Sequence, residues 1–350
     1  MEKIVFVVPN MVGGGTERIV ALFANELVKR GYPVAIMIFA GDQVVYPLDE
    51  RIEVLFVGEK SNGNPLVRLK RIKNMRNYYK ANKGCYIFGF SVMGTVFSVV
   101  AAAGIPHRLL VSERSDPSKY NLWRIRNWAY GKAEKVILQT EDTKQFFPDK
   151  LRKKAVVIPN PVPGNMPLPY QGERKKRIVS VGRLEKVKNH KLLIDAFAEF
   201  CKQHTGYELH LLGVGELEQE LRAQVTALGL EKEVVFRGFC ENVLEEIKDC
   251  GMYVLSSDYE GISNSMIEAL AMGVPVIATD CPVGGTKMYI EDGVNGLLVP
   301  VGNQAAMVQA MQKIAGDPAL AGKLSANGVK IREAYGLSKI VDILIKEAGI

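Results

Sequence analysis

Short apolar runs alternate along the chain with longer segments in which apolar residues recur every three or four positions. This alternation predicts strand–helix units on parallel sheets. The first strand is predicted at 3–8 and the first helix at 16–30, with Ile19, Val20, Phe23 and Leu27 on one face. Further strands are predicted at 34–39, 54–57 and 136–139. The pattern starts again near residue 178, with strands at 178–181, 209–212, 234–236, 253–256 and 276–278 and a helix at 191–201.

A proline-rich stretch at 158–168 separates the two series, since it can continue neither a helix nor a central strand. For 350 residues, two domains are also the natural expectation. We therefore predict α/β domains at 1–165 and 172–335, and a helix at 336–350 for which packing on the N-terminal domain is one open arrangement. Ligands of such domains bind at the carboxyl ends of the strands, so a cleft between them is the expected site.

One stretch, 84–106, contains no charged residue and is long enough to span a bilayer. Its four glycines fit equally well with a short strand followed by a helix of small residues. A membrane span here would split the first domain, so we favour the buried strand–loop–helix unit.

Charge and cysteine content narrow the class of protein. Residues 1–170 carry 25 Lys and Arg against 14 Asp and Glu, whereas the remainder is slightly acidic. The excess predicts an anionic surface or ligand beside the N-terminal domain. Five cysteines without a CxxC pair argue against a disulfide framework or a zinc site, and the four histidines lack ligand spacing. Aromatic platforms for nucleic acid are also missing.

Three segments carry candidate chemistry. Gly13–Gly15 follows the first strand, where backbone N–H groups can approach a phosphate. A dinucleotide fingerprint would need glycine at Arg18, although Asp42 keeps an NAD enzyme open. Gly182, Arg183 and Lys188 follow the first strand of the second domain, where two cations suit a diphosphate.

The third segment, 256–269, carries two carboxylates, Glu260 on a loop and Glu268 on the following helix. A retaining glycosidase needs its two carboxyl groups about 5–5.5 Å apart. Eight helical residues span about 12 Å. The spacing therefore predicts two contacts along one extended ligand.

The segment from Glu260 to Glu268 resembles the Glu-x7-Glu motif of glycosyltransferase family 4, whose members have the GT-B fold: two Rossmann-like domains facing each other across a cleft. Other matches follow in the family's order, at 13–15, 158–160, 182–188, 213–215, 236–238, 271–278 and 292–299. A His that many members carry is replaced here by the segment 112–117, Ser-Glu-Arg-Ser-Asp-Pro. That form resembles members that build bacterial surface polysaccharide and lipid-linked oligosaccharide.

The resemblance implies a role for each matching residue. Arg183 and Lys188 would bind the donor diphosphate and stabilise the leaving nucleotide, and Glu260 would contact hydroxyls of the donor sugar. Glu268 would accept hydrogen bonds from the ribose. The remaining donor contacts are expected from Gly14, Gly15, Gly182, Gly238, Phe239, Ser263, Asn264, Ser265 and Met266. Family members retain anomeric configuration and need no metal, which implies no cofactor. The resemblance also predicts that Glu260→Ala removes transfer and leaves nucleotide binding nearly unchanged.

Basic segments of the N-terminal domain supply candidates for the acceptor or a membrane. The segment 65–83 predicts an amphipathic helix, whose apolar residues Leu66, Leu69, Ile72 and Met75 lie opposite Arg68, Arg71 and Lys73. A second candidate is 122–128. The residues assigned to acceptor or membrane are Arg68, Arg71, Lys73, Glu113, Arg114, Arg124 and Arg126. The alternative is a solvated basic helix docked on the sheet.

We therefore predict a retaining, metal-independent glycosyltransferase. It would move a hexose or N-acetylhexosamine from a UDP- or GDP-sugar, UDP favoured, to a growing, lipid-linked glycan. The expected location is the cytoplasm, with the inner face of the plasma membrane as an open alternative. A sugar-nucleotide 2-epimerase of the same fold and a non-catalytic peripheral membrane scaffold remain as rival functions.

Overall fold

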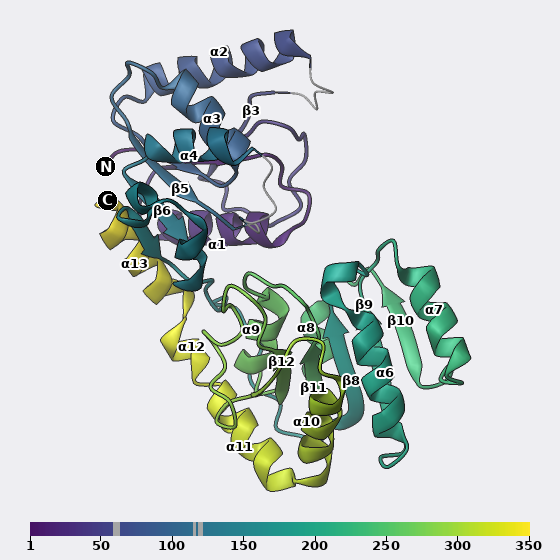
Figure 1. Ribbon diagram of the computed structural model, residues 1–350. Helices are drawn as coiled ribbons and strands as arrows, with labels where there is room; N and C mark the ends of the chain where they lie inside the picture. Colours follow the sequence, from purple (N-terminus) through teal and green to yellow (C-terminus); the bar gives the residue numbers. More distant parts are fainter. Residues whose placement is uncertain (59–63, 115–116, 118–121) are drawn as a thin grey trace. The chain divides into compact units, whose positions relative to one another are not determined.

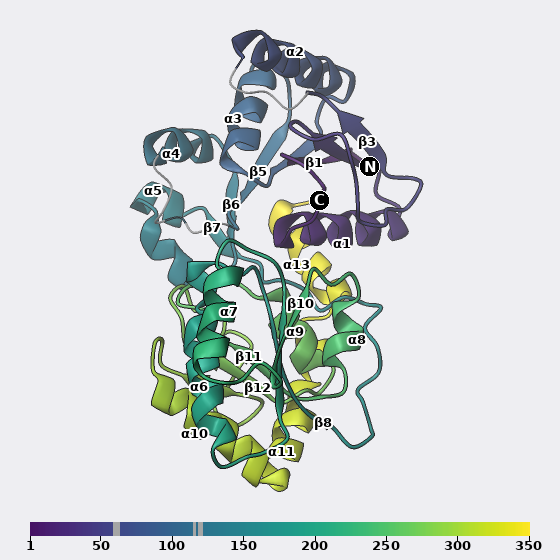
Figure 2. The same ribbon diagram turned by 90° about the vertical axis from the view of Figure 1, so that its right-hand side faces the viewer.

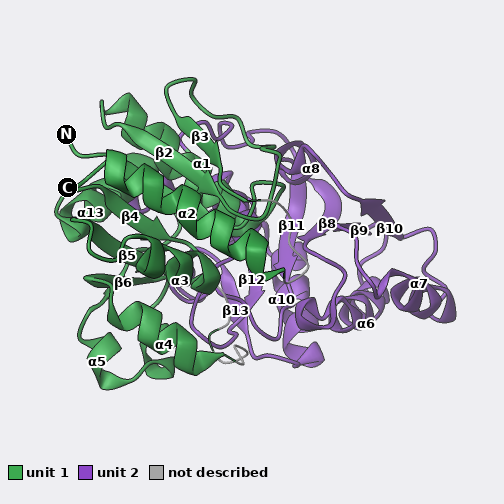
Figure 3. Cartoon of the chain, turned by 90° about the horizontal axis from the view of Figure 1, so that it is seen from above, with its two compact units in different colours: residues 1–163, 337–350 green, residues 164–336 purple. Residues whose placement is uncertain are grey.

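The computed structural model describes residues 1–58, 64–114, 117 and 122–350. The chain forms two compact units (Figure 3): unit 1 comprises 1–163 and 337–350, and unit 2 comprises 164–336. The first change of unit lies within the proline-rich stretch. Ser115 and Asp116, which belong to the segment 112–117 of the sequence analysis, lie outside the described residues.

Unit 1 contains a seven-stranded parallel sheet with the order β3-β2-β1-β4-β5-β6-β7 (Figures 1 and 2). Its strands are β1 (Ile4–Val8), β2 (Val34–Ile38), β3 (Glu53–Phe56), β4 (Tyr86–Gly89), β5 (Arg108–Ser112), β6 (Lys135–Leu138) and β7 (Ala155–Val157). The helices are α1 (Gly15–Lys29), α2 (Pro65–Ala81), α3 (Val92–Ala101), α4 (Trp123–Gly131), α5 (Asp149–Arg152) and α13 (Leu337–Ala348), with a 3-10 turn at Asp142–Phe146.

The helices of unit 1 form two layers. In the sheet, β1 pairs with both β2 and β4, so Ile4 lies between Val34 and Tyr86. The predicted apolar face of α1 is buried, and α1 packs against α13. Helices α2, α3 and α4 contact one another in sequence and contribute Met75, Phe97 and Tyr130 to one core cluster. These three helices therefore share one face of the unit.

The uncharged stretch 84–106 forms β4 and the ten-residue helix α3, which confirms the strand–loop–helix interpretation. Ser91 caps the helix by accepting a hydrogen bond from the Gly94 amide at 3.0 Å. Among the described residues, no helix has the length and apolar character needed to cross a membrane.

The amphipathic arrangement expected for α2 is confirmed at Met75 and wrong at Leu66, Leu69 and Arg71. Its buried residues are Arg71, Met75 and Tyr79, whereas Leu66 and Leu69 are exposed. The Arg71 guanidinium stacks over the Phe39 and Phe97 rings, at 5.4 and 5.0 Å from their centres. Because a guanidinium is weakly hydrated and stacks on aromatic faces, this position can be buried by an arginine. Arg71 is therefore a packing residue and contributes no charge to the surface.

Arg126 of α4 is also buried, which contradicts its assignment to a membrane-facing surface. It donates a hydrogen bond to the Pro117 carbonyl at 2.9 Å and lies 4.6 Å from the centre of the Phe147 ring. Its neighbour Arg124 is exposed and stacks on Trp123 at 5.3 Å. Through these two contacts, the guanidinium of Arg126 holds α4 against other parts of unit 1.

Unit 2 contains a six-stranded parallel sheet with the order β10-β9-β8-β11-β12-β13. Its strands are β8 (Lys175–Val181), β9 (Glu208–Leu212), β10 (Val234–Gly238), β11 (Cys250–Leu255), β12 (Val276–Thr279) and β13 (Leu297–Val299). Its helices are α6 (His190–Cys201), α7 (Glu218–Ala227), α8 (Val243–Ile247), α9 (Asn264–Ala271), α10 (Gln304–Gly316), α11 (Pro318–Gly328) and α12 (Ile331–Ala334), with a 3-10 turn at Lys186–Lys188. The core includes Leu193 and Phe197 of α6, as their spacing predicts.

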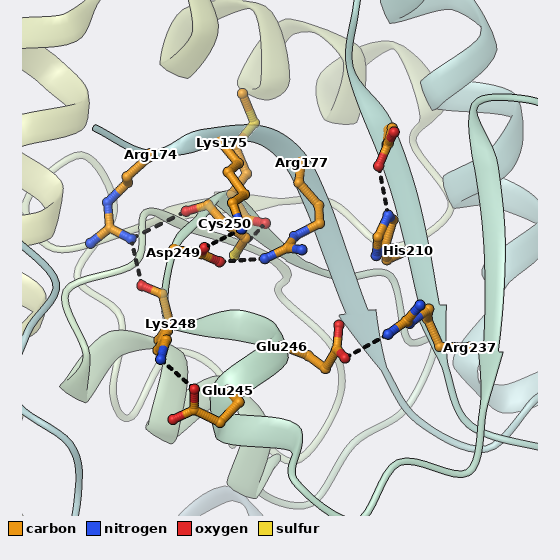
Figure 4. Close-up of polar contacts among 12 residues, drawn as sticks. Arg174, Lys175, Arg177, His210, Arg237, Glu245, Glu246, Lys248, Asp249 and Cys250 are labelled. Carbon is orange, nitrogen blue, oxygen red and sulfur yellow. Dashed lines mark hydrogen bonds and ion pairs between the residues drawn. The ribbon is translucent and has the colours of Figure 1, made fainter. Parts of the chain in front are cut away.

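An ionic cluster fixes the beginning of β8 against the beginning of β11 (Figure 4). Asp249 accepts hydrogen bonds from Lys175, at 2.7 Å, and from Arg177. Arg174 donates to the backbone carbonyls of Lys248 and Cys250. The two central strands of unit 2 are thereby fastened together at their amino ends, opposite the end at which parallel sheets bind ligands.

Candidate functional site

Two loops meet at the carboxyl ends of the neighbouring strands β8 and β11. The first loop leads from β8 through Gly182 to α6, and the second leads from β11 to α9. Ser256 donates a hydrogen bond to the Lys188 carbonyl at 2.9 Å, and the Asp258 amide donates to the Val187 carbonyl at 2.9 Å. Asn189 adds a side-chain contact to Asp258 at 2.7 Å. The two loops therefore form one connected structure within unit 2.

Within this structure the ammonium group of Lys188 forms an ion pair with the carboxylate of Glu260. The side chains are 18% and 15% exposed, so each remains accessible while being largely withdrawn from water. Ser257 also donates to Glu260, at 3.5 Å. The structure thus brings together two of the three residues expected to be catalytic, although they are far apart in sequence.

Arg183, the third such residue, extends into solvent. Its side chain is 73% exposed and forms an ion pair with Glu185 at 2.7 Å. An exposed pair of this kind contributes about 0–1 kcal/mol and rearranges at little cost. Arg183 therefore needs only a side-chain movement to contact a ligand.

The N-terminus of α9 is held by hydroxyl groups. Ser263 caps the helix, and its oxygen accepts the Met266 amide at 3.4 Å. Ser265 exchanges a hydrogen bond with the buried Tyr253 of β11 at 2.7 Å, and lies 3.2 Å from Ser263. These contacts occupy groups that the sequence analysis assigned to the donor. Tyr253 was not foreseen, because only the fold places it beneath the helix.

Two other expected donor residues differ sharply in exposure. Glu268 on α9 is 1% exposed, so its carboxylate lies below the surface of unit 2. Phe239 is 77% exposed. It follows Gly238, whose positive φ of 65° ends β10 and whose carbonyl accepts the Gly213 amide at 2.8 Å. An exposed ring beside a strand end offers a face on which a planar group can stack.

Glycine is required at two points where backbones approach each other. A Cβ on Gly285 would lie 1.4 Å from the carbonyl oxygen of Gly261, in the loop that precedes α9. A Cβ on Gly213 would lie 2.0 Å from the carbonyl oxygen of Gly182. No side chain fits such distances, so these glycines allow neighbouring loops to pack on both candidate loops.

Burial and charge shift the acidity of groups near the ion pair. Burial, together with the charge of Lys188, lowers the pKa of His190 to about 4. Burial, together with Glu260, raises the pKa of the Cys281 thiol to about 11. Both groups are therefore uncharged at neutral pH, so neither neutralises the charges of the pair.

Gly14 and Gly15 lie in unit 1, at the start of α1. The Gly14 amide donates to the Tyr46 hydroxyl at 2.8 Å, and the same hydroxyl donates back to the Gly14 carbonyl at 2.8 Å. Tyr46 was missed because it lies in a loop 32 residues away and carries no motif. The N–H and C=O groups of Gly14 are therefore both hydrogen-bonded to the Tyr46 side chain.

Glu113 and Arg114 follow β5 in unit 1 and contact a cavity of about 370 Å³. Arg68, Lys73 and Arg124 are exposed on α2 and α4.

Over the part of the chain that the structure describes, no three His, Cys, Asp or Glu residues gather as a metal site would require.

Each of the two units matches a family model of known proteins. Residues 13–163 match the family model described as Glycosyltransferase Family 4, and residues 170–331 match the model for glycosyl transferases group 1. Both models describe glycosyltransferases, and together they cover most of the chain. The chain is a glycosyltransferase of the GT-B type, as the sequence motifs indicated.

Relatives of this glycosyltransferase extend over its whole length. A Campylobacter jejuni enzyme is 29% identical over 99% of each chain, and is named N-acetylgalactosamine-N,N'-diacetylbacillosaminyl-diphospho-undecaprenol 4-alpha-N-acetylgalactosaminyltransferase. An uncharacterized glycosyltransferase of Haemophilus influenzae is 26% identical over 98% of each chain.

Solved structures agree in fold. Anabaena HepE in complex with UDP and glucose has a TM-score of 0.85 at 19% identity, with 100% of each chain covered. Sucrose-phosphate synthase from Thermosynechococcus elongatus has a TM-score of 0.83 at 19% identity, covering 99% of this chain and 98% of that one.

Proposed function

We propose that this glycosyltransferase moves a hexose or N-acetylhexosamine from a UDP-sugar, or less favourably a GDP-sugar, to a growing lipid-linked glycan. The product would enter bacterial surface polysaccharide or oligosaccharide biosynthesis. The observation that carries the proposal is the Lys188–Glu260 pair on two joined loops at the carboxyl ends of β8 and β11. Support comes from the polyprenyl-linked substrate in the name of the Campylobacter relative and from the UDP bound to HepE.

The pair supplies the two kinds of contact that a nucleotide sugar needs. Lys188 would bind the diphosphate and stabilise the charge that develops as the nucleotide leaves. Glu260 would accept hydrogen bonds from hydroxyls of the transferred sugar. Arg183, released from Glu185, would add a planar guanidinium to the phosphates.

Retention and independence of metal belong to the proposal because the resemblance to glycosyltransferase family 4 implies both. Cations of the protein take the position that Mg²⁺ holds elsewhere, and the leaving phosphate helps to deprotonate the acceptor hydroxyl. The new bond then forms on the face from which the nucleotide departs. The test is transfer in the presence of EDTA, with the anomeric configuration of the product read by NMR.

The first experiment is a thermal-shift panel with UDP, GDP, ADP, NAD and the common sugar conjugates, without added metal. A ligand present at a hundred times its Kd stabilises the folded state by about 2.7 kcal/mol. We expect a response to UDP and UDP-sugars. A response to NAD alone would overturn the proposal in favour of a dehydrogenase.

Two rival functions make separate predictions. A sugar-nucleotide 2-epimerase needs no acceptor, so isomerisation of the donor without acceptor would identify it. A non-catalytic membrane scaffold would bind vesicles and would neither bind a nucleotide nor transfer a sugar.

A lipid-linked acceptor requires access to a membrane, and we propose that the layer formed by α2, α3 and α4 provides it at the cytoplasmic face. Leu66 and Leu69 of α2 are exposed, as are Trp123 and Trp128 of α4. The exposed basic residues of the same helices are Arg68, Lys70, Lys73, Lys80 and Arg124. Tryptophan favours the headgroup region, and each basic residue near an anionic surface contributes about 1 kcal/mol.

Co-sedimentation with vesicles tests this surface. We expect binding to vesicles that contain phosphatidylglycerol, weakened when Trp123 and Trp128 are both replaced by serine. Equal binding to neutral and anionic vesicles would refute the electrostatic part of the proposal.

A further inference from the structure

The loop that carries Glu260 follows β11, which lies between β8 and β12 in the sheet of unit 2. Parallel strands end at the same edge of a sheet, so the segments that follow these three strands lie side by side. On the β8 side, Ser256 and Asp258 donate hydrogen bonds to backbone carbonyls of the loop that contains Lys188. On the β12 side, the segment 279–286 contacts the same loop. The position of Glu260 therefore depends on both neighbouring segments.

Three buried hydroxyl groups connect the segment 279–286 to Glu260. Thr286 donates to the Thr279 carbonyl at 2.9 Å, and Thr279 donates to the Ser257 carbonyl at 2.5 Å. Ser257 in turn donates to the Glu260 carboxylate at 3.5 Å, the longest of the three contacts. All three residues are 0% exposed, so no water replaces a donor that is removed. Thr279 is the central member, because it joins the end of β12 to the loop after β11.

The segment 279–286 also touches the Glu260 loop through its backbone. A Cβ on Gly285 would lie 1.4 Å from the carbonyl oxygen of Gly261, so the two chains meet directly beside Glu260. Val283, two residues earlier, is buried and has a φ of 69°. A β-branched residue persists in this left-handed conformation only where its surroundings fix it. The segment is therefore rigid and can hold the neighbouring loop in one position.

The contacts of Glu260 show what this support controls. Lys188 and Ser257 both contact the Oε2 atom of the carboxylate. A carboxylate accepts about four hydrogen bonds through its two oxygens, so Oε1 can receive hydroxyl protons of a sugar. The ion pair alone would let the carboxylate follow the flexible Lys188 side chain. A fixed Ser257 peptide instead sets the direction in which Oε1 points.

We propose that Thr279 is a positioning residue for Glu260. Its hydroxyl fixes the Ser257 peptide and thereby directs the Glu260 carboxylate toward the donor sugar. The inference rests on the proposed function, in which Glu260 accepts hydrogen bonds from that sugar. Thr279 is fully buried and acts through Glu260 without contacting the ligand.

Isothermal titration with UDP and with UDP-sugars tests this role and needs no acceptor. The probe is whichever of UDP-glucose, UDP-galactose, UDP-N-acetylglucosamine and UDP-N-acetylgalactosamine binds the wild type most tightly. The Kd of UDP divided by the Kd of this probe measures what the sugar contributes to binding. Thr279→Val removes the hydroxyl and keeps the shape, and should lower the ratio about threefold or more, because a hydrogen bond to a charged group is weakened. Thr279→Ser keeps the hydroxyl and should keep the wild-type ratio.

A double-mutant cycle with Glu260→Gln shows whether Thr279 acts through Glu260. In the Glu260→Gln background, Thr279→Val should change the ratio no further. A general disturbance of unit 2 would lower the ratio in both backgrounds. Ser325→Ala is the matched control, since the Ser325 hydroxyl donates to the Gly273 carbonyl at the opposite end of β12. Its loss should leave the ratio unchanged.

The outcomes separate this inference from its foundation. UDP binding by each variant shows that its site is folded. If Thr279→Val does not fold, Thr286→Val, which acts one contact further away, should lower the ratio by a smaller factor. An unchanged ratio in the folded variant, or an equal fall in the Glu260→Gln background, overturns the inference. Failure of the proposed function would instead appear as absence of UDP binding in the wild type, or as a Glu260→Gln variant with the wild-type ratio.

Discussion

The ion pair between Lys188 and Glu260 makes a prediction about nucleotide affinity. In the structure Glu260 already neutralises the cation that a diphosphate would use. A phosphate must therefore displace this carboxylate from Lys188, and part of the binding energy is lost in doing so. We expect Glu260→Gln to bind UDP more tightly than the wild type while losing sugar transfer. This differs from the unchanged nucleotide binding that the sequence alone predicts for Glu260→Ala.

The size of the effect follows from burial. Two unit charges about 4 Å apart interact by about 4 kcal/mol at an effective dielectric constant of about 20. Both side chains retain some exposure, and glutamine keeps one neutral hydrogen bond to Lys188, so most of this figure is offset. We therefore expect Glu260→Gln to gain about 1.4 kcal/mol in the free energy of UDP binding, which corresponds to a Kd about tenfold lower.

Isothermal titration with UDP at low and high salt measures the change. Glu185→Gln is the matched control, since it removes the partner of Arg183 from an exposed pair and should alter the Kd by less than about twofold. The gain in Glu260→Gln should persist at high salt, because the pair is largely withdrawn from water. An unchanged or weaker Kd for UDP in Glu260→Gln would refute the reasoning.

Three further predictions concern stability. Folding lowers the pKa of His190 from 6.5 to about 4, so between these pH values the unfolded chain binds a proton that the folded chain does not. The free energy of unfolding should therefore fall by about 3 kcal/mol as the pH drops from about 6.5 to 4. Urea unfolding should show a smaller fall in His190→Gln. Gly285→Ala should cost more than about 2 kcal/mol, whereas Gly316→Ala, whose added methyl meets nothing within 4 Å, should be neutral or stabilising; equal melting temperatures would contradict this. Arg126→Leu should cost about 2–3 kcal/mol by leaving the Pro117 carbonyl unbonded, whereas Arg124→Leu should change stability by less than about 0.5 kcal/mol.

Much of the fold could be predicted because its elements repeat simple patterns. Apolar periodicity located α1 and α6 within one residue at their starts, and the prolines at 158–168 located the first change of unit. The loop motifs of the site were also visible, since glycines and charges follow strand ends. The donor-site residues expected from the resemblance remain predictions, to be tested by ligand binding.

Pairing between distant residues could not be predicted. Lys188 and Glu260 meet because β8 and β11 are adjacent in the sheet, although β9 and β10 lie between them in sequence. The orientation of α2 was wrong because a polar–apolar pattern counts Arg71 as solvated, whereas Phe39 and Phe97 make a buried position favourable for its guanidinium. Tyr46 and Tyr253 were missed because a lone tyrosine carries no signal of its partner.

Helix α13 belongs to unit 1 but follows the whole of unit 2 in the sequence. Arg30, the residue that follows α1, donates to the Ser338 carbonyl at 2.8 Å and pairs with Asp342 at 2.5 Å. Tyr86 of β4 donates to the Gly349 carbonyl at 2.6 Å. On the ribosome, every residue of unit 2 is synthesised before the final helix of unit 1. Unit 2 can therefore fold while unit 1 still exposes the apolar surface that α13 covers. The domain translated first is then the last to be finished, and a truncation of α13 would harm the distant N-terminal unit more than the unit that immediately precedes it.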